Sequence, residues 1–143
     1  PICRSRGGLT TKIHALVDAR GRPICLKLTA GQAHDGRSAT DMFATLAPGQ
    51  VLLADRAYDS DALHDEMAAR GVIANIRLMP TRKRFPAFDH QLYRKRNVVE
   101  RFFNKLKQFR AVATRYDKRD DNFLASVQLA AIRIWIKENE SVA

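Results

Sequence analysis

The sequence has little cysteine, no long apolar run and a shortage of acidic residues, and each shortage argues against a class of protein. Its two cysteines, Cys3 and Cys25, have neither a CxxC spacing nor a neighbouring histidine cluster, so we expect free thiols rather than a zinc site or a disulfide framework. No run approaches the roughly 18 consecutive apolar residues of a membrane-spanning helix, and no secretory signal is recognisable. We therefore expect a cytoplasmic protein that makes no membrane contact.

The acidic residues are outnumbered by basic ones. The chain has 25 Lys and Arg against 15 Asp and Glu, a formal net charge of +10. Residues 77–119 contain 14 of the 25 basic residues and only three acids, Asp89, Glu100 and Asp117. Such an excess favours polyanionic partners through counterion release, which makes nucleic acid the leading candidate. A solvated basic surface that only keeps the protein soluble is the alternative.

At 143 residues and 45% apolar content, the chain fits a single domain with one core. Residues 1–10 show no periodicity and begin with Pro rather than Met, so we expect a loop that once continued upstream. Periodicity and turn residues predict the following elements: a β-hairpin of 11–17 and 24–28, a helix opening at 34–36 with Asp35 as its N-cap, a strand at 51–54 buried on both faces, a helix at 60–70 between Ser60 and Gly71, and a strand at 72–78.

These six elements follow a β-β-α-β-α-β order, typical of an α/β fold. Two further helices come after an exposed connector at 79–90. One spans about 92–110. The other, at about 121–137, is expected to bury its apolar residues, which are Phe123, Leu124, Val127, Leu129, Ile132, Ile134 and Trp135. His14, His34, His64 and His90 lack ligand spacing and are interpreted as structural or surface residues.

The helix at 92–110 has two distinct faces. Its apolar face contains Val98, Val99, Phe102, Phe103, Leu106 and Phe109. Its polar stripe contains Tyr93, Arg96, Glu100 and Lys107. A carboxylate flanked by cations on a rigid helix can bind a metal while the cations hold phosphates. The alternative is an ordinary solvated face with an ion pair between Arg96 and Glu100.

Asp55 is a second candidate, because it directly follows the strand at 51–54. Open α/β sheets bind ligands beyond the carboxyl ends of their strands, although a turn or cap role is the simpler alternative. Asp55 and Glu100 would supply the hard oxygen ligands of a metal site that cleaves phosphodiesters, and a third acidic ligand is normally needed for two ions.

The spacing of Tyr93, Arg96, Glu100 and Lys107 resembles the C-terminal signature of bacterial insertion-sequence DDE transposases. Residues 54–59, Ala-Asp-Arg-Ala-Tyr-Asp, resemble the second-aspartate motif of that family. Residues 31–35 and 114–118 are similar to the group called insertion sequence family 5, which is related to the family 4 transposases. The likeness covers essentially the whole chain.

The resemblance implies a ribonuclease-H-like mixed sheet flanked by helices, here lacking its first strand. Asp55 and Glu100 would be the second and third members of an Asp-Asp-Glu set that holds two Mg²⁺ ions, for which Mn²⁺ can substitute. Tyr93, Arg96 and Lys107 would contact or position DNA. The first aspartate has no convincing match, since Asp18 lies in the hairpin turn and Asp35 at a helix start. Residues 1–143 would thus be a partial catalytic domain that an upstream N-terminal portion completes, either a split reading frame or a decayed copy.

The implied activity is metal-dependent phosphodiester hydrolysis followed by strand transfer at insertion-sequence ends, inactive in this chain alone. The implied partners are element ends, target DNA and further copies of the protein, at the nucleoid. The competing function is a non-catalytic basic DNA-binding module. A ribonuclease-H-like nuclease outside transposition and a basic ribosome-associated protein are further alternatives; the latter does not explain the spacing of the polar stripe.

Overall fold

The computed structural model describes residues 11–38, 40–114 and 119–141. The chain divides into two compact units. The insert unit is Gln32–Arg96, and the hairpin–helix unit combines Pro1–Gly31 with Asn97–Ala143. The expected loop at 1–10, Cys3 and most of the motif at 114–118 lie outside the described residues. The expectation of a single partial domain over 1–143 stays a prediction.

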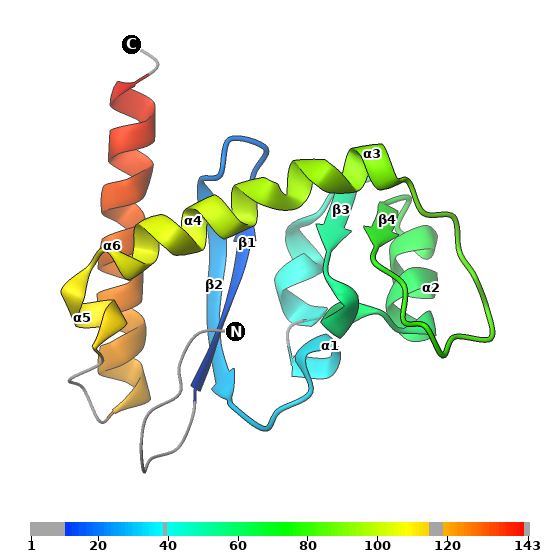
Figure 1. Ribbon diagram of the computed structural model, residues 1–143, viewed down its shortest axis with the longest axis horizontal. Helices are drawn as coiled ribbons and strands as arrows, with labels where there is room; N and C mark the ends of the chain where they lie inside the picture. The colour runs from blue at the N-terminus through cyan, green and yellow to red at the C-terminus, as the bar shows by residue number, and fades with distance from the viewer. Residues whose placement is uncertain (1–10, 39, 115–118, 142–143) are drawn as a thin grey trace. The chain divides into compact units, whose positions relative to one another are not determined.

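The hairpin–helix unit consists of a two-stranded antiparallel sheet and three helices (Figure 1). Its elements are β1 (Thr11–Val17), β2 (Pro23–Ala30), α4 (Asn97–Lys107), α5 (Arg110–Ala113) and α6 (Asp120–Glu140). The predicted hairpin is confirmed. Asp18 closes its turn by accepting hydrogen bonds from the amides of Arg20 and Arg22 and from Arg22 Nε at 2.7 Å. Partial burial raises the pKa of the Asp18 carboxyl, but these hydrogen bonds outweigh burial and lower it overall.

The core of this unit is apolar. The sheet contributes Ile13, and α4 contributes Phe102 and Leu106. The remaining buried members come from α5 and α6, namely Val112, Phe123, Val127, Ala130, Ala131 and Ile134. Because these residues recur at three- and four-residue intervals on α4 and α6, each helix turns one stripe to the core. The predicted apolar face of the helix at 92–110 is confirmed, with Phe102 and Leu106 at its buried centre.

Two expectations about the C-terminal helices are wrong. The helix at 92–110 is divided into α3 (His90–Tyr93), a 3₁₀ turn η3 (Arg94–Arg96) and α4, which ends at Lys107. It ends there because the amides of Gln108 and Phe109 bond three residues back instead of four.

α6 buries fewer apolar residues than expected, since Leu129, Ile132 and Trp135 are 68%, 55% and 39% exposed. At about 100° per residue they lie away from the stripe that faces the core. Trp135 is instead covered by the Arg22 guanidinium, 4.8 Å from the ring centroid.

The insert unit contains two parallel strands with helices around them (Figure 1). Its elements, besides α3 and η3, are α1 (Asp35–Ser38), η1 (Thr40–Thr45), β3 (Val51–Ala54), η2 (Arg56–Tyr58), α2 (Asp61–Ala69) and β4 (Ile73–Ile76). As predicted, Ser60 caps α2 through Leu63 N, and Gly71, with φ of 71°, follows its end. The β-β-α-β-α-β order is confirmed, with short 3₁₀ turns between its members.

Three details of the insert unit differ from the expectation. Asp35 is the first residue of α1 and not its N-cap, and β4 ends at Ile76 instead of residue 78. β3 is not buried on both faces, because Val51 is 39% exposed while Leu52 and Ala54 are buried. A strand with a single described neighbour keeps the alternation of a half-buried sheet. Across the described ranges, no helix is both long and apolar enough to cross a membrane.

Candidate active-site residues

Asp55 lies where the parallel pairing of β3 and β4 ends. The last paired residues are Ala54 and Ile76, and Asp55 begins the turn η2. Its Oδ1 accepts a hydrogen bond from Ala57 N at 2.9 Å, so the cap role considered as an alternative is real. The side chain is still 39% exposed, and a carboxylate has about four lone-pair sites. Capping therefore leaves Asp55 able to bind a further ligand.

Arg96 joins Asp55 across 41 residues of sequence. Its Nη2 lies 3.2 Å from Asp55 Oδ2, and the guanidinium is 6.0 Å from the centroid of the Tyr93 ring. Such a partly exposed pair contributes at most about 1 kcal/mol to folding. Its importance is positional, because it places an Arg fork, which suits phosphate oxygens, beside a carboxylate that suits a cation. Asp55, Tyr93 and Arg96 are thus brought together within the insert unit.

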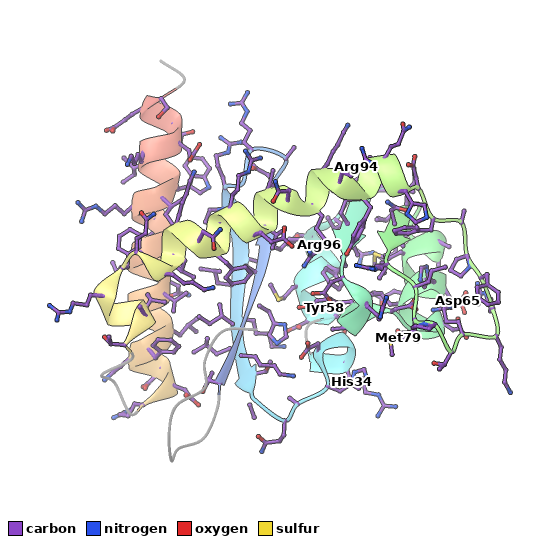
Figure 2. All side chains as sticks on the ribbon, viewed as in Figure 1. His34, Tyr58, Asp65, Met79, Arg94 and Arg96 are labelled. Carbon is purple, nitrogen blue, oxygen red and sulfur yellow. The ribbon has the colours of Figure 1, made fainter. Side chains whose placement is uncertain are left out.

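Tyr58 belongs to the same neighbourhood (Figure 2). Burial of its ring raises the pKa of the phenol, and the charges of Asp55 and Asp35 raise it further, while Arg96 acts in the opposite direction. The hydroxyl therefore stays protonated at neutral pH. Tyr58 adds a neutral hydroxyl, and no negative charge, to the surroundings of Asp55.

A buried ionic network, which the sequence reading did not identify, lies beside this turn. The side chain of Asp59 is fully buried and accepts hydrogen bonds from Met79 N at 2.6 Å, from His64 Nε2 at 3.0 Å and from Arg82. Arg82 is only 7% exposed and also pairs with Asp61. The network ties the turn after Asp55 and the first turn of α2 to the chain that follows β4. His64 is structural, as predicted.

Asn75 forms a second anchor that the sequence did not indicate. Its side-chain amide donates to Asp89 O at 2.9 Å and accepts from Asp89 N at 2.8 Å. Asp89 in turn caps α3 through the amides of Gln91 and Leu92. The start of the helical segment that carries Tyr93 and Arg96 is therefore fixed to β4. No local sequence pattern predicts this role for an asparagine.

Glu100 and Lys107 belong to the hairpin–helix unit. Glu100 is exposed in the first turn of α4, where the helix dipole favours a negative charge, and Lys107 is exposed at its last residue. The seven positions between them amount to about two turns, so they share a face of α4. Phe102 and Leu106, both at most 1% exposed, hold the opposite face in the core.

In the parts of the chain that the structure describes, no group of three or more His, Cys, Asp or Glu side chains is close enough to hold one metal ion. Asp55 lies in the insert unit and Glu100 in the hairpin–helix unit. The assignment of both residues to a metal site stays a prediction. Cys25, the cysteine within the described ranges, is a free thiol.

Comparison with known proteins defines the class. The family model of the transposase DDE domain matches residues 3–135, and the chain belongs to this family. Membership implies DNA transposition and DNA binding in general, and the family typically uses divalent metal ions. The mixed α/β architecture of the two units is consistent with such a domain.

The particular relatives come from bacterial insertion sequences. One, from Brucella ovis, is named "Putative transposase for insertion sequence element IS6501"; it is 39% identical over 130 residues, which cover 90% of this chain and all of the relative. Another, from Burkholderia cepacia, is named "Putative transposase for insertion sequence element IS402" and is 28% identical over 94% of this chain and 65% of its own length. No solved structure matches the chain.

Proposed function

We propose that the chain is part of the catalytic domain of an insertion-sequence transposase, which hydrolyses phosphodiesters at element ends and transfers the freed strand to target DNA. The observation that carries this proposal is Asp55, which follows β3, remains 39% exposed and lies 3.2 Å from the Arg96 guanidinium. A carboxylate and a phosphate-binding group at the end of a strand are the parts that such a reaction needs. The proposed fold is ribonuclease-H-like, with residues 1–143 forming part of one catalytic domain.

The donor set fits a divalent cation. Asp55 retains lone pairs beyond its bonds to Ala57 N and Arg96, and Glu100 is an exposed carboxylate on a helix whose other face is fixed in a core. Mg²⁺ and Mn²⁺ prefer such oxygen ligands and keep further positions for water and substrate oxygens. Asp55 and Glu100 would hold the metal. Two bound ions would supply an activated water oxygen and stabilise the leaving oxygen of an in-line displacement.

The remaining residues would handle the DNA. Arg96, held by Asp55 and the Tyr93 ring, presents a planar donor fork to a phosphate. Tyr93 would pack beside the backbone, and Lys107 would contact phosphate from the far end of α4. Because two acidic ligands rarely balance two divalent ions, cleavage would need a third carboxylate. We place that ligand on an upstream portion, so the proposed activity appears only on complementation.

A non-catalytic DNA-binding module is the second candidate, and a specific observation favours it. Asp55 caps η2 and pairs with Arg96, which gives both residues a structural role that needs no metal. The exposed basic residues of the insert unit, such as Arg94 and Lys95, would then bind phosphates alone. This function predicts salt-sensitive DNA binding that is indifferent to Mg²⁺.

The test is nicking of supercoiled and linear DNA with element ends, in Mg²⁺ or Mn²⁺, by the 143-residue chain alone and with the upstream portion added. Glu100→Gln and Asp55→Asn should each reduce nicking by about 100-fold or more, because each removes a metal ligand. Glu66→Gln is the matched control, since it makes the same chemical change at an exposed position of α2.

The transposase is supported if nicking appears only when the upstream portion is added, is lost in Glu100→Gln and is retained in Glu66→Gln. Nicking by the chain alone would show that a third ligand is already present. DNA binding without nicking in either arrangement would favour the binding module.

A further inference from the structure

Phe85 is the most exposed large apolar side chain in the described parts of the chain, at 70%. It lies in the loop between β4 and α3, in the insert unit. A phenyl ring has no polar group through which to bind water, so an exposed ring adds nothing to the solubility or stability of the unit.

The loop that carries Phe85 is held in place at several points. Near its start, the Met79 amide and the Arg82 guanidinium both bind the buried Asp59 carboxylate. Arg84 Nη2 also lies 2.6 Å from Asp65 Oδ1 on α2, an exposed pair that lowers the pKa of the Asp65 carboxyl but adds little to the anchoring (Figure 2 labels Asp65 and Met79). At its end, the two hydrogen bonds between Asn75 and Asp89 close the loop. A ring presented on a preorganised loop binds with little loss of conformational entropy.

The charges around the ring indicate the chemistry of the ligand. Residues 77–96 contain seven Lys and Arg and one acid, Asp89, and three of the seven, Arg82, Arg84 and Arg96, pair with aspartates from outside this range. Lys83 and Arg84 directly precede Phe85, and both are exposed. An exposed aromatic ring beside exposed cations fits a polyanion that carries flat apolar groups, since the cations attract phosphates while the ring stacks on a base.

We infer that Phe85 stacks on an unpaired DNA base while the basic residues beside it hold the neighbouring phosphates. The bases of an intact duplex are already stacked on each other, so the ring is useful only where a base is unpaired or displaced. The inference rests on the proposed function and extends it, because it gives the transposase a preference for DNA whose strands are locally open.

The test compares two labelled DNAs of equal length and charge, a perfect duplex and a duplex with a central unpaired loop that contains 2-aminopurine. Binding of the full chain is measured by fluorescence anisotropy without metal, and stacking by quenching of the 2-aminopurine. Phe85→Ala should weaken binding to the looped DNA by about 5- to 100-fold and abolish the quenching, because one base–aromatic stack is lost. Binding to the duplex should change by less than about twofold.

Three variants serve as controls. Phe85→Trp keeps a stacking surface and should retain both affinity and quenching. Leu129→Ala removes a side chain of similar exposure, 68%, from α6 and should change neither. Lys83→Gln should weaken binding to both DNAs equally, because a phosphate contact carries no preference for open strands. Unchanged thermal unfolding of Phe85→Ala, expected of so exposed a residue, excludes a folding defect.

If Phe85→Ala lost the same affinity for both DNAs, or lost affinity for neither, the inference would be overturned and the proposed function would stay intact. Phe85→Ala that lowers only self-association would also overturn it and assign the ring to a protein contact. If the unsubstituted chain binds neither DNA, the proposed function fails as well.

Discussion

The two units are stabilised by different interactions. The hairpin–helix unit closes around apolar side chains such as Phe102, Leu106 and Val127, each at most 1% exposed. The insert unit also buries apolar residues, but it surrounds the fully buried side chain of Asp59 with His64 and Arg82. Apolar packing tolerates many arrangements, whereas a buried ionic network is stable only in one geometry. The comparison teaches that the charged network sits where a loop and a turn must be held in fixed positions.

The largest expected effect is on the apolar unit. Phe102→Ala should lower the free energy of unfolding by about 3–5 kcal/mol, because it removes a fully buried ring and leaves a cavity. Urea unfolding gives the magnitude, and hydrogen exchange resolves where protection is lost. We expect the loss in β1, α4 and α6. An equal loss across Asp61–Ala69 would mean that the two units unfold as one, and the comparison would lose its basis.

The next effect is on the network. Asp59→Asn should lower the free energy of unfolding by about 1–3 kcal/mol, because an amide cannot balance the nearly buried Arg82 guanidinium. Its matched control is Asp65→Asn, which removes the same charge from a surface pair with Arg84 and should leave stability almost unchanged. Hydrogen exchange of residues 78–89 should rise in Asp59→Asn alone. Similar losses in both variants would mean that burial of the network adds nothing.

The smallest effect concerns alkaline pH. Because the pKa of Tyr58 is raised on folding, its contribution to stability is present below the ordinary tyrosine pKa of about 10 and is lost as the pH rises above it. The thermal unfolding temperature should therefore fall less steeply with rising pH in Tyr58→Phe than in the unsubstituted chain, between neutral pH and the alkaline range. A parallel pH titration of tyrosinate absorbance should show that Tyr58→Phe lacks the part of the signal that appears at the highest pH. Identical slopes would show that Tyr58 is not buried in solution.

Local patterns in the sequence predicted the local structure well. Alternation gave the hairpin, and Ser60 and Gly71 marked the limits of α2, because caps and strand faces depend on residues a few positions apart. The apolar residues of α6 did not reveal which stripe would be buried. They occur around much of the helix, and only packing against β2 and α4 decides the matter.

The candidate site was predicted residue by residue but not as an arrangement. Asp55 and Arg96 were each named from a motif, yet their contact spans 41 residues and follows no periodicity. The anchors Asp59–Arg82 and Asn75–Asp89 were missed for the same reason, since a charged or amide side chain carries no signal of a distant partner. Phe85 would have been visible as an aromatic among basic residues, but only its exposure distinguishes it from core.

The hairpin–helix unit is interrupted in sequence, since the 65 residues of Gln32–Arg96 separate its hairpin from its helices. During synthesis the hairpin emerges from the ribosome long before α4 and α6, which supply most of the apolar surface that covers it. The insert unit is continuous in sequence, so all of its internal contacts can form as soon as residue 96 has left the ribosome. The nascent chain must therefore carry an uncovered apolar sheet through the translation of the whole insert, which is the interval when it is most exposed to aggregation and to chaperones.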